Sequence, residues 1–194
     1  MYALRTILAL LAFYTALLTG CTTSRTASAS GDAERALDTT LVTLYTFPDD
    51  WVGKWGGPLQ IFKGDSLQYQ IPMELHLLPT DTLDRYTFII IYDGNARDYA
   101  IEAVDKSRGL WVIDERNTIA IESYVLGNAL VSQFGVQTTE ILSSYQRVPG
   151  GIISEIFSTS TDTVSTTGGT SEQIPAVYTY PVTNRQRAML RRVE

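Results

Sequence analysis

The sequence predicts an all-β protein, an up-and-down antiparallel meander barrel of about ten strands. From Trp51 onward, apolar and polar residues alternate with the period of two that is typical of strands, and no stretch has a clear helical period. Turn-forming residues interrupt this pattern at short, regular intervals. Because sequential strands with short connections would leave unpaired edges in an open sheet, we expect the first strand to pair with the last.

The first four strands are separated by segments rich in Gly, Pro, Asp and Asn, which favour turns. Alternation is clearest in the second strand, where apolar residues from Leu67 to Leu77 alternate with residues such as Gln70, Glu74 and His76. These strands are expected at residues 51–62, 67–78, 86–92 and 97–104.

The remaining strands follow the same rule. Gly127-Asn128 is a two-residue hairpin signal, and a loop rich in Thr, Ser and Gly at residues 161–173 precedes the last strand. If residues 183–193 form a helix instead, one strand is lost and a barrel is still expected; a sandwich with longer crossovers is the other alternative. These strands are expected at residues 110–114, 118–126, 129–136, 141–148, 152–159 and within 176–193.

The N-terminal segment has the layout of a secretory signal. Arg5 precedes a nearly unbroken apolar stretch at residues 7–18, which at about 12 residues is too short to cross a bilayer. The run Leu17-Leu18-Thr19-Gly20-Cys21 that follows resembles a bacterial lipobox. The resemblance implies a signal peptide at residues 1–20, cleavage before Cys21, and acylation of Cys21, which would anchor the protein to a membrane.

Cys21 is the only cysteine of the chain, so no disulfide is possible within it. A free thiol behind an ordinary cleavable signal is the alternative to acylation. Residues 21–40 read as the lipidated cysteine followed by a small, polar, flexible tether, and residues 41–194 as the barrel domain. Thr22, which follows the cysteine and is not an aspartate, implies transport to the outer membrane of a bacterial cell envelope.

A short motif suggests a family. Gly53-Lys54-Trp55, at the start of the first predicted strand, resembles the Gly-x-Trp signature of the lipocalins and the wider calycin group, in which the tryptophan plugs the closed end of the barrel. Residues 111–119 also resemble a turn of lipocalin-like bacterial lipoproteins. Ten strands exceed the lipocalin eight, and no arginine-bearing final motif is identified. The resemblance implies binding of a small apolar or amphiphilic molecule, with no reaction.

The fourth predicted strand supplies the first binding candidates, because Arg97 and Tyr99 share one face. We expect both to face a cavity, with Glu74 or Glu155 as a carboxylate partner, since a buried unpaired charge is costly. The alternative places the mid-strand glutamates on the wet face of each strand. Four glutamates have such a position: Glu74, Glu102, Glu122 and Glu155.

Other function classes have little support. The formal net charge of −6 argues against nucleic-acid binding. No nucleophile elbow, phosphate-binding glycine loop or paired-histidine metal motif occurs, so we predict neither an enzyme nor a bound metal or cofactor. His76, the only histidine, is expected at the surface beside Glu74; a haem ligand is the alternative. A structural or assembly lipoprotein that acts through contacts with another envelope protein remains the second function class.

Overall fold

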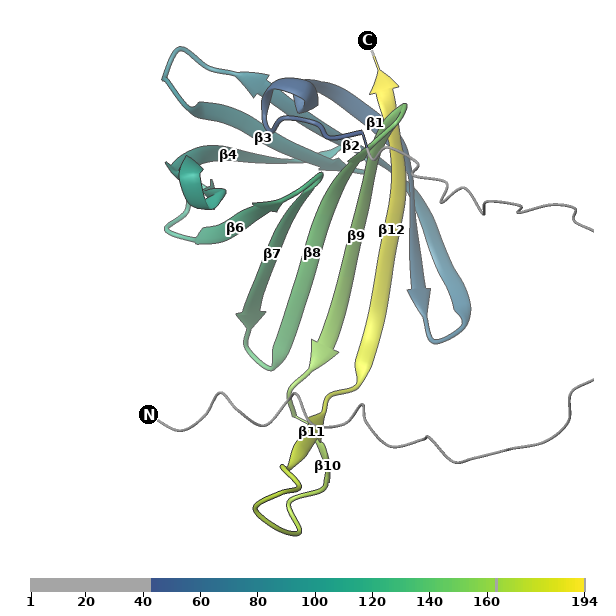
Figure 1. The fold of residues 1–194 in the computed structure, drawn as a ribbon. Helices are drawn as coiled ribbons and strands as arrows, with labels where there is room; N and C mark the ends of the chain where they lie inside the picture. The colour runs from purple at the N-terminus through teal and green to yellow at the C-terminus, as the bar shows by residue number, and fades with distance from the viewer. Residues whose placement is uncertain (1–42, 163, 194) are drawn as a thin grey trace, which may run out of the picture. The chain divides into compact units, whose positions relative to one another are not determined.

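The computed structural model describes residues 43–162 and 164–193, which belong to one compact unit, Leu41–Glu194. The signal peptide, Cys21 and the tether that the sequence predicts lie outside these residues. The unit is a closed antiparallel barrel in which ten strands follow one another in chain order, as predicted (Figure 1). The barrel consists of β1 (Gly53–Lys63), β2 (Ser66–Pro79), β3 (Arg85–Tyr92), β4 (Asn95–Asp105), β5 (Leu110–Asp114), β6 (Ala120–Leu126), β7 (Ala129–Val136), β8 (Thr139–Val148), β9 (Gly151–Ser160) and β12 (Val182–Val193).

The barrel closes through β1 and β12. Their pairing runs from Lys54 opposite Val193 to Phe62 opposite Arg185. The alternative of a C-terminal helix is therefore wrong. The residues of β12 alternate instead, with Ala188 and Leu190 fully buried and Arg191 exposed.

Three small elements were not expected from the sequence. Two are 3-10 turns, η1 (Asp49–Trp51) and η2 (Lys106–Arg108), and the third is a ribbon of β10 (Ser165–Thr167) and β11 (Val177–Thr179) within the loop that joins β9 to β12. Because Trp51 ends η1, β1 begins at Gly53 rather than at residue 51.

The chain enters the barrel at the end formed by η1 and the β6–β7 turn. Asn128 of this turn accepts a hydrogen bond from the backbone N–H of Tyr45 at 2.8 Å and donates one to the carbonyl of Thr43 at 2.5 Å. Arg147 holds η1 in place, since its Nε donates to the carbonyl of Asp50 at 3.0 Å. We call this the closed end.

Large side chains fill the barrel near the closed end. Trp51 lies between Phe47 and Trp55: its ring meets that of Phe47 edge to face at 5.2 Å, and its carbonyl accepts a hydrogen bond from the Trp55 indole at 2.8 Å. Phe47 also meets Trp111 edge to face at 4.9 Å. Aromatic pairs of this geometry add to the stabilisation from burial alone. The unfilled space of the barrel therefore lies toward the opposite end.

Candidate ligand-binding cavity

A cavity of about 510 Å³ occupies the other part of the barrel. Its walls come from inward-facing positions near the β1–β2, β3–β4, β5–β6 and β7–β8 turns, which lie opposite the closed end. A volume of this size falls within the range of small-molecule sites. Ten of its lining side chains are apolar: Leu59, Ile61, Ile71, Phe88, Ile90, Ile113, Ile121, Phe134, Ile141 and Ile156.

Strand alternation explains why these side chains point inward. In β3, Phe88, Ile90 and Tyr92 are two residues apart and all line the cavity, while their neighbours face outward. Phe88 meets Tyr145 of β8 edge to face, with ring centroids 5.5 Å apart. This contact lies where the cavity meets the packed core, because both side chains belong to the buried cluster.

Arg97 and Tyr99 both line the cavity, in the positions that the alternation of β4 predicts. Arg97 is exposed, whereas Tyr99 is half-buried. The other charged residue of the lining is Glu115, which follows the last residue of β5. Within the described residues Arg97 takes part in no ion pair, and its exposure to water removes the need for one.

Three tyrosines lie close enough to affect one another. Burial raises the pKa of Tyr92 and, to a larger extent, that of Tyr145. Burial and the negative charge of Glu115 raise the pKa of Tyr99, and the positive charge of Arg97 opposes them. All three phenols therefore keep their protons at neutral pH, so they can donate hydrogen bonds. The other polar residues of the lining, besides Arg97 and Glu115, are Ser132, Ser143, Ser158 and Gln186.

Glu74 and Glu155 do not lie in the cavity. Glu74 accepts a hydrogen bond from His76 at 2.7 Å, and its neighbours Met73 and Leu75 take the inward positions of β2. Glu155 pairs with Arg185 at 2.6 Å, between the inward Ser154 and Ile156 of β9. The expectation that one of them faces Arg97 across the cavity is not met. Alternate side chains of a strand point to opposite faces, and both glutamates point away from the cavity.

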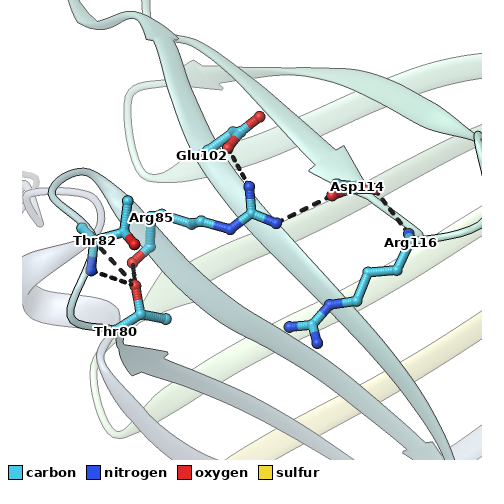
Figure 2. Close-up of polar contacts among 6 residues, drawn as sticks. All are labelled: Thr80, Thr82, Arg85, Glu102, Asp114 and Arg116. Carbon is cyan, nitrogen blue, oxygen red and sulfur yellow. Dashed lines mark hydrogen bonds and ion pairs between the residues drawn. The ribbon is translucent and has the colours of Figure 1, made fainter.

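The other two glutamates also lie on the outer wall. Figure 2 shows Arg85 of β3 between Glu102 of β4 and Asp114 of β5. Arg85 Nη1 is 2.5 Å from Glu102 Oε2, and Nη2 is 3.1 Å from Asp114 Oδ2. The backbone N–H of Arg116, followed by the Arg85 side chain, lowers the pKa of Asp114. Glu122 accepts a hydrogen bond from the Tyr124 hydroxyl at 3.0 Å. The Arg85 ion pairs join β3 to β4 and β5, whereas the Glu122–Tyr124 hydrogen bond lies within β6. None of these side chains lines the cavity.

Gly53 and Trp55 lie at the closed end, and Trp55 is 2 % exposed. Two arginines cover its ring: the guanidinium carbon of Arg147 is 4.8 Å from the ring centroid, and that of Arg192, from the last strand, is 4.6 Å away. Arg192 also donates to the carbonyl of Val52 at 3.0 Å. Neither arginine was expected over Trp55 from the sequence, although the closing of the last strand against the first could have pointed to Arg192.

Glu115 was missed as well. It falls in a segment that reads as a turn, yet it continues the inward series of Trp111 and Ile113 in β5. Applying the alternation of inward and outward side chains to the residue after β5 would have identified Glu115.

No protein-family model, curated protein or solved structure matches the chain. The barrel is compatible with a lipocalin-like fold, and this likeness rests on strand order and on Trp55 alone. In the part of the chain that the structure describes, no helix is long and apolar enough to span a membrane. The same residues contain no cluster of three or more His, Cys, Asp or Glu side chains arranged to hold a metal ion.

Proposed function

We propose that this protein is a lipocalin-like lipoprotein that binds a small amphiphilic molecule and catalyses no reaction. The observation that carries the proposal is the cavity of about 510 Å³, with apolar walls and a few polar groups. The apolar chain of the ligand lies against side chains such as Leu59, Phe88 and Ile156, where burial of apolar surface favours binding.

The polar groups favour a ligand with a carboxylate or a similar anionic head. Arg97 brings a positive charge that no described ion pair neutralises, and Tyr92 and Tyr99 bring phenolic donors close to it. Hydrogen bonds between charged partners are the stronger class, so they can fix the orientation of the head group. Because Arg97 is exposed, we place the head at the outer part of the cavity and the chain deeper inside.

Replacing Arg97 with glutamine tests this orientation. We expect the affinity for an anthroyloxy-labelled fatty acid to fall at least about tenfold, since a charge-assisted hydrogen bond contributes about 1.5–3 kcal/mol. Fluorescence titration measures the change, and Arg187→Gln on the outer wall is the matched control. The methyl ester of the probe should bind the parent protein and Arg97→Gln equally. Equal affinity of both proteins for the free acid would contradict the proposed role of Arg97.

We also propose that Cys21 carries the lipid and anchors the protein to the bacterial outer membrane. The lipobox-like run supports this anchor, and acyl chains bind a bilayer through their buried methylenes. Cys21→Ser is expected to move the protein from the membrane fraction to the soluble fraction after cell lysis. Immunoblots of the two fractions measure the distribution. A Cys21→Ser protein that still sediments with membranes after a high-salt wash would contradict lipid anchoring.

A further inference from the structure

The wall of the barrel is incomplete between β6 and β7. Only three residue pairs join these strands, and the last is Tyr124 opposite Val131. On their other sides, β6 pairs with β5 over residues 120–124, and β7 pairs with β8 along its whole length. Residues 120–123 of β6 and 132–136 of β7 therefore diverge beyond the hairpin (Figure 1). We call the gap between these two segments the notch.

Two serines mark the base of the notch. Ser123 and Ser132 would form the next pair of the ladder, but instead their hydroxyls form a hydrogen bond of 2.7 Å. Both are buried, with exposures of 0 % and 5 %. Each hydroxyl gives the other a hydrogen-bond partner at the point where backbone pairing between β6 and β7 stops. The wall can therefore open beyond this point without breaking a backbone hydrogen bond between the two strands.

The notch lies between the cavity and a hollow on the outer wall. Ile121 and Phe134, one on each side of the notch, line the cavity. The side chains of the next residues, Glu122 and Gln133, point to the outer face of the barrel. They line the outer hollow, which has a volume of about 480 Å³. The hollow is completed by Tyr124, Leu126, Val131 and Leu142.

We propose that the notch is a lateral entry site and subsite for a linear amphiphile. This inference rests on the proposed function and adds the route and the shape of the ligand. The chain passes sideways between β6 and β7 into the cavity, and the part that the cavity does not hold lies over Leu126, Val131 and Leu142. We expect this gap to admit an unbranched chain more readily than a rigid ring system.

A covalent staple across the notch tests the route. Glu122→Cys and Gln133→Cys, introduced into the full chain with Cys21→Ser, provide the only two thiols, which a short bismaleimide joins. Stopped-flow fluorescence then measures the association rate of the anthroyloxy fatty acid. We expect the stapled protein to bind about tenfold more slowly than the same protein without the cross-linker, as is typical when access to a site is restricted. Mass spectrometry confirms the cross-link.

A second staple serves as the control. Gln146 and Ile153 are paired on the outer faces of β8 and β9, away from the cavity lining. Joining cysteines at these positions should leave the association rate unchanged. Equal rates with and without the staple at the notch would overturn the lateral route but leave the proposed function standing. Failure of the unstapled protein to bind the probe at all would instead contradict the proposed function.

Discussion

Trp55→Ala is expected to lower the free energy of unfolding by about 3–5 kcal/mol, as large-to-small core substitutions do. Trp55 is 2 % exposed, donates to the Trp51 carbonyl at 2.8 Å, and supports the guanidinium groups of Arg147 and Arg192. Alanine would leave a cavity at the closed end and remove the ring on which both arginines pack. Chemical denaturation monitored by circular dichroism measures the loss.

Tyr69→Ala provides the control for Trp55→Ala. Tyr69 lies in the neighbouring strand β2 and is 66 % exposed, so its removal should change the free energy of unfolding by less than about 0.5 kcal/mol. If Trp55→Ala unfolds at the same denaturant concentration as the parent protein, Trp55 is not the structural plug that Gly53-Lys54-Trp55 led us to expect.

Gly57→Ala should destabilise the barrel where it closes. A Cβ atom at Gly57 would lie 2.3 Å from the carbonyl oxygen of Met189, which belongs to the backbone of β12. The backbones of β1 and β12 must move apart to accept it, and overpacking of this kind typically costs about 1–3 kcal/mol. Thermal unfolding of the variant and its parent measures the effect.

The adjacent glycine gives a matched comparison. A Cβ at Gly56 would first meet Val193 Cγ1 at 3.1 Å and Glu74 Cγ at 3.6 Å, which are side-chain atoms that can shift. Gly56→Ala should therefore cost less than Gly57→Ala, since side chains can move aside at a lower cost than the backbone of a paired strand. Equal melting temperatures for the two variants would mean that β1 and β12 do not approach closely at Gly57.

Much of the barrel could be predicted because its turns are local. Asp93 and Gly94, for example, adopt positive φ values of 47° and 80°. The sequence Asp-Gly-Asn predicts such a turn without any knowledge of tertiary contacts. Alternation within one strand likewise places Arg97 and Tyr99 on a common face. These properties depend on neighbouring residues only.

Contacts between strands that are far apart in the sequence could not be predicted from neighbouring residues. Glu74 and Arg97 each belong to a well-predicted strand, but the face that each presents depends on the register of the whole barrel. The cover of Trp55 by Arg147 and Arg192 joins three segments far apart in the chain. The early end of the β6–β7 ladder has no signal in either strand alone, because it results from how both fit the closed sheet.

The position at which the chain enters the barrel determines which end of the cavity stays accessible. Asn128 fixes Thr43 and Tyr45 at the closed end, whereas Arg97 and the other outer cavity residues lie near the opposite turns. The first described residues therefore join the barrel at the end away from the outer cavity residues, and they leave the approach to the exposed Arg97 side chain clear.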